Sequence, residues 1–386
     1  MMPAPHRVAV ALVALAATPG GQSEQGGGCA LTAQGGVPVN PQLFGYNLEV
    51  FGTMTNNSMS DTGGMAVADA LHLGTLRYPG GTMSNVWDPK AGRYVDGCCG
   101  PNGSHSYSKF KPYADLIEAA GPPGTFSAAK FLQGVGGRAK TTIWDLNVYS
   151  FDSTQICAQI EYIASLPPPP GGVHFLELGN ELYSSGQGAP KFPSGASYAE
   201  QMKPIVACAR RILPKAKIAA VGFSGPAASA WSRGIAESGL DVDAVSLHTY
   251  IPHDSDVAAV PAAEKLAYVA GYSRQLLRHC VNVSVDTFGS DVAIWHTEFN
   301  YGLETDIFFP KLVFGALHGV FHASRILASI ELHDHVHALT FQTFVHPYPY
   351  PPHDTAFHKA MPVARLSPQG NRPDLAQVSG TAQLVR

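Results

Sequence analysis

The sequence carries little charge and no excess of positive charge. Only 14% of its 386 residues are Asp, Glu, Lys or Arg, and the formal net charge is −4 at pH 7. Proteins that bind nucleic acid or an anionic membrane through electrostatics carry clusters of Lys and Arg, so this composition argues against both kinds of partner. With 45% hydrophobic residues, the chain can instead bury a large core.

Several motifs are also missing. No CxxC pair is present, which argues against a zinc site built on cysteines. No candidate strand is followed by GxGxxG or GxxxxGK(S/T), so a loop for a dinucleotide or a nucleoside triphosphate is not indicated. The apolar run near the N-terminus is about ten residues long, too short to span a bilayer, and no later stretch is a candidate transmembrane helix.

That short run predicts a secretory signal peptide. Arg7 precedes the apolar residues 8–17, and Ala14-Leu15-Ala16 is a small-x-small sequence of the kind that signal peptidases cleave. We therefore expect residues 1–17 to be a signal peptide, residues 18–43 to be an N-terminal segment, and the protein to be extracellular or lumenal. A disordered tail is the alternative.

Cysteines and glycosylation sequons agree with export. The six cysteines are even in number, so three disulfides are possible, although free buried thiols fit the count equally well; they are Cys29, Cys98, Cys99, Cys157, Cys208 and Cys280. Asn56, Asn102 and Asn282 each begin an N-x-Ser sequon, which predicts a glycoprotein. No pattern in the sequence specifies an oligomeric state.

Short apolar segments alternate with stretches of helical periodicity after residue 40. The strand candidates are residues 44–49, 74–80, 141–149, 174–180, 217–223, 242–250, 292–299 and 337–344. Alternating strands and helices predict a parallel α/β fold, and eight strands are the number that closes a (β/α)8 TIM barrel. We expect the barrel over residues 44–350 and a C-terminal tail, or an incomplete β appendage, over residues 351–386. A doubly wound open sheet is the alternative.

Two of the candidate strands end in glutamate. Glu181 follows the fourth strand and Glu298 lies in the seventh, and in an eight-stranded barrel these strands face each other across the mouth. Two carboxylates across a cleft are the groups that glycosidic bond hydrolysis requires: one donates a proton to the leaving oxygen, and the other captures the anomeric carbon. The pair therefore predicts an O-glycosyl hydrolase.

The strand motifs resemble those of a known group. LELGNEL at the fourth strand resembles the Asn-Glu signature of the clan A retaining glycoside hydrolases, IWHTEFN resembles their nucleophile segment, and LHTY resembles their His-x-Tyr. With LRYPGGT and IWDLNVY, the chain looks most like the heparanase/β-glucuronidase group and the α-L-arabinofuranosidases. The resemblance implies a secreted enzyme that needs no cofactor and cleaves an oligosaccharide, polysaccharide or glycoconjugate by double displacement.

The resemblance also implies roles for individual residues. Glu181 would be the general acid/base and Glu298 the nucleophile. The expected substrate-binding or orienting residues are Asn180, Arg77, Asn147, His248, Tyr250, Trp87 and Gln342. Among them, Arg77 is expected to keep Glu298 ionised, and Gln342 stands on the eighth strand where many relatives carry a tryptophan. Trp87, in the long connection after the second strand, either stacks on a sugar ring or packs against the barrel. Glu177 is expected to pair with Arg77 inside the barrel.

Two other classes of function remain open at this stage. A catalytically inactive barrel that binds glycans would share the fold, although both glutamates are present here. A metal-dependent hydrolase would need several histidines to converge with a carboxylate at the strand ends, and only His248 is so placed. His333, His335 and His337 are expected at the N-terminal side of the barrel, away from the site. His318 and His322, four apart on a helix, lack the intervening Glu of a zinc-protease motif, so no metal site is predicted.

Overall fold

The computed structural model describes residues 39–48, 62–98, 111–184, 186–188, 191–223, 228–250, 257, 259–300 and 316–342. The expected signal peptide, the C-terminal tail, Cys29, Cys99, Asn56 and Asn102 lie outside these residues.

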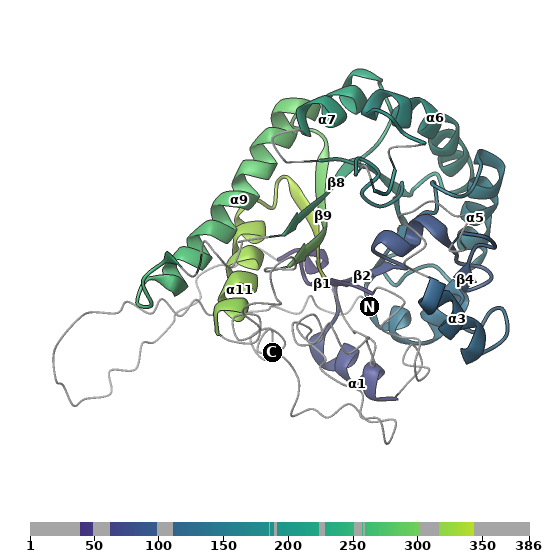
Figure 1. The fold of residues 1–386 in the computed structure, drawn as a ribbon, viewed down its shortest axis with the longest axis horizontal. Helices are drawn as coiled ribbons and strands as arrows, with labels where there is room; N and C mark the ends of the chain where they lie inside the picture. The colour runs from purple at the N-terminus through teal and green to yellow at the C-terminus, as the bar shows by residue number, and fades with distance from the viewer. Residues whose placement is uncertain are drawn as a thin grey trace, which may run out of the picture. The chain divides into compact units, whose positions relative to one another are not determined.

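The centre of the fold is a closed barrel of eight parallel strands (Figure 1). In chain order they are β1 (Gly45–Asn47), β2 (Thr75–Tyr78), β5 (Thr141–Asp145), β6 (Phe175–Glu177), β7 (Lys217–Val221), β8 (Ala244–Tyr250), β9 (Ala293–Asn300) and β10 (Val336–Gln342). β1 pairs with both β2 and β10, which closes the ring. The predicted TIM barrel is confirmed, with a strand at each of the eight expected segments.

Helices surround the barrel, and α5, α6, α7 and α9 follow one another along its outside in Figure 1. The described helices are α1 (Thr62–Leu71), α3 (Lys111–Ala120), α4 (Ala128–Gln133), α5 (Ser153–Ser165), α6 (Gly195–Ile212), α7 (Ala228–Glu237), α9 (Lys265–Phe288) and α11 (Ala316–Glu331). Short 3-10 turns lie at Pro41–Leu43, Thr82–Val86 and Val135–Arg138. No helix in the described ranges is long and apolar enough to cross a membrane.

Local sequence explains where the helices begin. The Asp152 side chain accepts a hydrogen bond from the Gln155 amide (2.9 Å), and the Gln155 side chain accepts one from the Asp152 amide (3.0 Å). This reciprocal capping box satisfies two donors that the first turn of α5 leaves free. Ser194 caps the start of α6 in a similar way, because its hydroxyl accepts a hydrogen bond from the Ser197 amide.

The long connection after β2 contains structure that the sequence pattern did not predict. Trp87–Asp88 (β3) and Arg93–Tyr94 (β4) form a two-stranded antiparallel hairpin, and α3 follows. Trp87 is fully buried, donates a hydrogen bond from its indole N–H to the Tyr78 hydroxyl (3.1 Å), and meets Tyr94 edge to face. Trp87 therefore ties this hairpin to Tyr78 of β2.

The barrel interior has two layers. An apolar layer fills the end where the strands begin, and includes Ile143, Phe175, Ala219, Ala244, Ala293, Trp295 and Ala338. Side chains two residues apart on a strand point to the same face, so Glu177 lies above Phe175 and Asp145 above Ile143. The interior thus changes from apolar to charged toward the ends where the strands stop.

A disulfide between Cys157 and Cys208 joins α5 to α6. The two cysteines are 51 residues apart in sequence, so the bond removes many conformations from the unfolded chain. This finding confirms one of the disulfides that the cysteine count allows, and it agrees with an oxidising compartment.

Replacing both Cys157 and Cys208 with serine should lower the free energy of unfolding by about 2–4 kcal/mol, because the unfolded chain regains loop entropy. Urea denaturation followed by tryptophan fluorescence measures the change. Each single serine variant should match the double variant, since either one breaks the bond. An unchanged unfolding midpoint in all three would contradict the prediction.

Candidate active site

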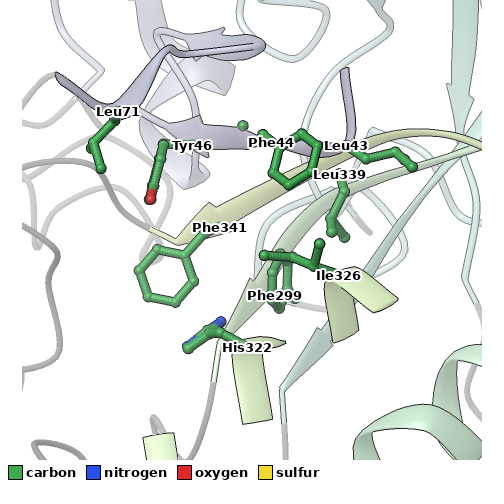
Figure 2. A pocket seen from close by; sticks show the side chains of 10 residues that line it. Leu43, Phe44, Tyr46, Leu71, Phe299, His322, Ile326, Leu339 and Phe341 are labelled. Atoms are coloured by element: carbon green, nitrogen blue, oxygen red, sulfur yellow. The ribbon is translucent and has the colours of Figure 1, made fainter. Parts of the chain in front are cut away.

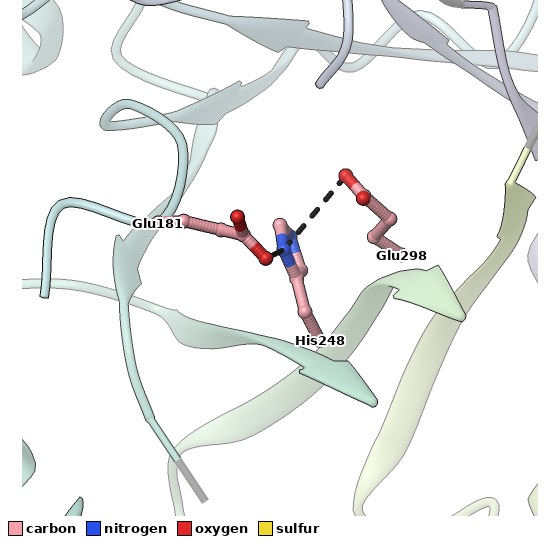
Figure 3. A group of neighbouring side chains, drawn as sticks. All are labelled: Glu181, His248 and Glu298. Carbon is pink, nitrogen blue, oxygen red and sulfur yellow. Dashed lines mark hydrogen bonds and ion pairs between the residues drawn. The ribbon is translucent and has the colours of Figure 1, made fainter. Parts of the chain in front are cut away.

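Three side chains converge where β6, β8 and β9 end (Figure 3). Glu181 lies in the loop after β6, His248 lies in β8, and Glu298 lies in β9 directly opposite His248 in register. His248 Nδ1 is 2.9 Å from Glu181 Oε1 and 3.8 Å from Glu298 Oε2. The two glutamates predicted from the sequence therefore share one imidazole between them.

The separation of the carboxylates is diagnostic for glycosidases. One oxygen of Glu181 and one of Glu298 lie within 4.8 Å of each other. Retaining glycosidases hold their two carboxyl groups about 5–5.5 Å apart, whereas inverting enzymes leave about 6.5–9.5 Å for a water molecule. The two nearest carboxylate oxygens are therefore closer together than the range for inverting enzymes.

Arg77 is the cation that contacts the buried carboxylates of the site. Its guanidinium donates from Nε to Glu177 Oε2 (2.6 Å), from Nη1 to Glu298 Oε2 (3.2 Å) and from Nη2 to Asn180 Oδ1 (2.8 Å). Nη2 is also 2.7 Å from Asp145 Oδ2. The ion pair expected between Arg77 and Glu177 is present, and the same cation touches Glu298.

Burial makes these charges depend on one another. Arg77, Asp145 and Glu177 have side chains with no exposed surface. Burial alone would lower the pKa of Arg77, but Asp145, Glu177 and Glu298 raise it above its ordinary value. Burial raises the pKa of Asp145 well above its usual range, because the attraction of Arg77 only partly offsets desolvation and Glu177 adds repulsion. A single guanidinium thus serves three carboxyl groups.

Glu181 adopts an unusual backbone conformation. Its φ is +46°, in the left-handed region that residues other than glycine rarely enter. Gly179, two residues earlier, has φ +97°, and a Cβ there would lie 2.7 Å from side-chain atoms of Val148 and Leu182. Strained backbone of this kind is concentrated at functional sites, where it aims a side chain. At this position it directs Glu181 toward His248.

Hydrogen bonds set the charge of Glu181. Its Oε1 is bonded to His248, and its Oε2 accepts from Gln187 Nε2 at 2.7 Å. Burial raises the pKa of Glu181, but His248, Gln187 and Arg77 lower it more, so the pKa lies below its ordinary value in this state. The Glu181 carboxylate is thus ionised beside His248 near neutral pH.

A set of amides holds the loop that carries Glu181. Asn85 Nδ2 donates to the Asn180 carbonyl (2.8 Å), and Asn85 Oδ1 accepts from the Asn180 amide (3.1 Å). Asn180 Nδ2 in turn donates to Gln187 Oε1 (3.2 Å). Asn180 is therefore fixed on both its backbone and its side chain, next to the two glutamates.

Glu298 has a second polar neighbour besides Arg77. Asn47, the last residue of β1, lies with Nδ2 3.4 Å from Glu298 Oε2. Gly80 packs against Asn47 so closely that a Cβ would lie 1.7 Å from Asn47 Oδ1, and its φ is +73°. This contact requires glycine, and it accounts for the Pro-Gly-Gly turn after β2.

The remaining predicted site residues have different surroundings. Tyr250 ends β8, is half-buried, and pairs in register with Asn300. Gln342 ends β10 opposite Asn47, and its side chain lies outside the described part of the chain. Asn147 donates to the Trp87 carbonyl (3.1 Å) and exchanges hydrogen bonds with Ser150. It holds two loops together, and its contact with substrate stays a prediction.

The sugar-stacking role suggested for Trp87 is wrong. A stacking platform needs an exposed ring face, and this indole has none. Trp87 instead packs against the barrel, which is the other role that the sequence allowed.

Four polar residues of the site did not stand out in the sequence. They are Asn47, Asn85, Asp145 and Gln187. Asp145 had a usable signal in the sequence, because it is a charged residue on an apolar strand. In the structure it lies in register with Glu177. The other three come from the end of a short strand and from loops, where polar residues are common.

A small apolar pocket also lies on the outer face of the sheet (Figure 2). Phe44, Phe299, His322, Leu339 and Phe341 are among the residues that line it, from β9, β10, α11 and the start of β1. Leu339 and Phe341 alternate with the inward-facing Ala338 and Thr340, so the pocket faces α11 and not the carboxylates. It is a packing feature, separate from the candidate site.

The cluster of Glu181, His248 and Glu298 also has the geometry to hold a divalent cation, since their ligand atoms lie within 4.8 Å of one another. Arg77, however, places a positive charge 3.2 Å from the Glu298 oxygen. The guanidinium already neutralises that carboxylate, which opposes binding of a second cation there.

Fold and site together define a TIM barrel with two facing carboxylates at the strand ends. No protein-family model matches the chain, and no curated protein matches its sequence. Solved structures do match. A family 51 α-L-arabinofuranosidase from Bifidobacterium longum is 15% identical with a TM-score of 0.58, and the match covers 79% of this chain and 67% of that one.

Two further structures illustrate the range of enzymes with this fold. An α-L-arabinofuranosidase from Thermotoga maritima is 17% identical with a TM-score of 0.54, covering 80% of this chain and 65% of that one. A family 44 xyloglucanase from Paenibacillus polymyxa is 12% identical with a TM-score of 0.51, covering 84% and 76%. The chain spans about two thirds of the length of the arabinofuranosidases. At these identities the likeness establishes the fold.

Proposed function

We propose that this protein is a retaining O-glycosidase that hydrolyses α-L-arabinofuranosides, with Glu181 as acid/base and Glu298 as nucleophile. The observation that carries the proposal is the 4.8 Å limit on the separation of one oxygen of Glu181 from one oxygen of Glu298, at the strand ends of a TIM barrel. The sugar is suggested by the arabinofuranosidases that share the fold. Secretion, proposed from the N-terminal sequence, agrees with the disulfide.

The contacts of Glu298 suit a nucleophile. Arg77 and Asn47 both donate to Oε2, so the charge of the carboxylate is held in place for attack on the anomeric carbon. In the first step, Glu298 forms an ester with the sugar while a proton passes through Glu181 to the leaving oxygen. In the second step, Glu181 takes a proton from water, and the hydroxyl displaces Glu298 with net retention.

The charge balance favours a neutral sugar over a uronic acid. A glucuronide would bring a further carboxylate to a cleft that already holds Glu181 and Glu298. Arg77, the cation beside Glu298, is already engaged with Asp145, Glu177 and Asn180. Desolvating another anion without a partner costs several kcal/mol, so the β-glucuronidase alternative is less favoured.

Covalent labelling tests the proposal. The full chain is incubated with cyclitol aziridines of α-L-arabinofuranosyl and β-D-glucuronyl configuration, and the labelled peptide is mapped. We expect the arabinofuranosyl probe to label Glu298, with or without chelator. Glu298→Gln should abolish labelling, and Glu200→Gln, an exposed surface control, should keep it.

Three other outcomes would each point to a different substrate or function. Labelling of Glu298 by the glucuronyl probe alone would show that the substrate is a glucuronide and not an arabinofuranoside. The double-displacement mechanism would still hold. Sugar binding without labelling or turnover would indicate a glycan-binding barrel. Hydrolysis that chelator removes and Glu298→Gln preserves would establish a metal-dependent hydrolase.

Replacing Glu181 with alanine should separate its role as general acid from its role as general base. Turnover of an alkyl α-L-arabinofuranoside, a poor leaving group, should fall by about 10²–10⁴-fold, because no group donates the proton. Added azide should accelerate turnover of an activated aryl substrate and yield the arabinofuranosyl azide of retained configuration, since no general base is needed for azide. Product NMR checks both points. Failure of azide to change the rate or the product would contradict the assignment of Glu181.

A further inference from the structure

A chain of hydrogen bonds runs through the barrel interior and links the two catalytic glutamates. It begins at Glu181, passes to His248 Nδ1 (2.9 Å), and leaves the ring at Nε2, which is 3.1 Å from Thr297 Oγ1. Thr297 then donates to Glu177 Oε1 (2.8 Å). Glu177 receives Arg77 Nε on its other oxygen (2.6 Å), and Arg77 donates to Glu298 (3.2 Å).

The direction of each bond in this chain follows from the chemistry of the groups. Glu177 is ion-paired with Arg77 and is therefore an acceptor at both oxygens. The single hydroxyl proton of Thr297 is committed to Glu177. Toward His248, Thr297 can therefore only accept, so His248 Nε2 must carry a hydrogen. The proton that His248 gains and loses must then be the one on Nδ1.

Nδ1 is the ring nitrogen that faces both glutamates. It is 2.9 Å from Glu181 and 3.8 Å from Glu298, and only 5% of the His248 side chain is exposed. With Nε2 fixed as a donor, a proton exchanged between Glu181 and His248 must move along the 2.9 Å bond at Nδ1. Glu177 and Thr297 are completely buried, so solvent does not compete for these hydrogen bonds.

We propose that Glu177 and Thr297 are positioning residues that keep the transferable proton of His248 on Nδ1, so that His248 supplies the acid proton to Glu181. The inference rests on the proposed hydrolase function. In the first step, the proton moves from Nδ1 to Glu181 Oε1 and on to the leaving oxygen, which leaves neutral His248 and the ester of Glu298. In the second step, a proton from water returns through Glu181 to Nδ1 as the ester is hydrolysed.

The leaving group of the substrate separates this role from a merely structural one. The phenolate of a phenyl glycoside needs a proton as it leaves, whereas 2,4-dinitrophenolate is stable enough to leave as the anion. Thr297→Val keeps the shape of the side chain but removes the oxygen that receives Nε2–H. For this variant, kcat/KM of the phenyl α-L-arabinofuranoside should fall by about 10²-fold, within the range of general acid catalysis, and that of the 2,4-dinitrophenyl substrate by less than about 3-fold.

Thr297→Ser is the matched control. It keeps the hydroxyl, and both substrates should react within about 3-fold of the wild-type rate. Glu177→Gln should behave like the valine variant, because the Gln amide can donate to Thr297 and reverse the direction of the chain. Equal losses on both substrates in Thr297→Val, or no loss on either, would overturn the proposal.

A second measurement does not require enzymatic activity, and it does not depend on whether a Thr297 variant folds normally. Nitrogen NMR of ¹⁵N-histidine-labelled wild-type protein reports the tautomer of neutral His248, with its signals assigned by comparison with His248→Gln. We expect the hydrogen on Nε2. A hydrogen on Nδ1 of the neutral ring would overturn the proposal. If the chain hydrolyses no sugar, the hydrolase function fails on its own, and the tautomer still decides this inference.

Discussion

Replacing Glu298 with glutamine should reduce kcat for an aryl α-L-arabinofuranoside by about 10⁴–10⁶-fold, as removal of a nucleophile does in other enzymes. The amide is isosteric with the carboxylate, but it cannot form the ester with the anomeric carbon. Burst kinetics and steady-state turnover measure the loss. Among the described residues, Glu181 is the other carboxylate beside His248, and both of its oxygens are already bonded, to His248 and to Gln187.

The variant should remain folded. Glutamine can still accept a hydrogen bond from Arg77 through its carbonyl oxygen, so the thermal midpoint should stay within a few degrees of the wild type. Glu331→Gln, on the exposed surface beside Arg274 and Arg278, is the matched control and should retain full turnover. Residual activity above about 1% of wild type in a folded Glu298→Gln protein would contradict the assignment.

Replacing Arg77 with methionine should cause the largest loss of stability of any single change at the site. The guanidinium is the common partner of Asp145, Glu177 and Glu298. Removing one partner of a buried ion pair leaves an uncompensated charge and costs about 3–5 kcal/mol. Urea unfolding measures the loss. Lys203→Met, which breaks an exposed pair with Glu200, is the control and should change stability very little.

The loss in Arg77→Met should depend on pH. Burial already raises the pKa of Asp145 in the wild type, while Arg77 lowers it, so the variant's pKa rises further. The native variant then keeps a proton that the unfolded chain has released, and stability falls as pH rises above the ordinary carboxyl pKa of about 4. Urea titrations across pH should show the deficit relative to wild type narrowing toward pH 4. A deficit that widens on acidification would contradict the buried-charge account.

The barrel could be predicted from sequence because its signals are local. Each expected strand is a short apolar run bounded by turn residues, and the helices between them show the 3.6-residue period or a capping box such as Asp152–Gln155. The hairpin of β3 and β4 was missed because strands of two residues carry no periodicity. α3 was missed because it lies inside a connection rich in glycine and serine.

The site could be predicted only in part. Glu181, Glu298 and His248 come from recognisable strand-end motifs, and the charge of Glu177 on an apolar strand implied a partner such as Arg77. Thr297 gave no such signal, because a threonine is ordinary in a strand and its role depends on contacts 49 and 120 residues away in sequence. Trp87 was misread because an aromatic residue in a loop has the same local sequence whether it packs or binds.

The stereochemistry of hydrolysis tests the central claim most directly. Proton NMR during hydrolysis of an aryl α-L-arabinofuranoside, before mutarotation, identifies the anomer of the first sugar released. Carboxylate oxygens of Glu181 and Glu298 within 4.8 Å of each other predict α-L-arabinofuranose, formed with retention through an ester on Glu298. The β anomer as first product would contradict the account, because inversion requires a direct attack by water.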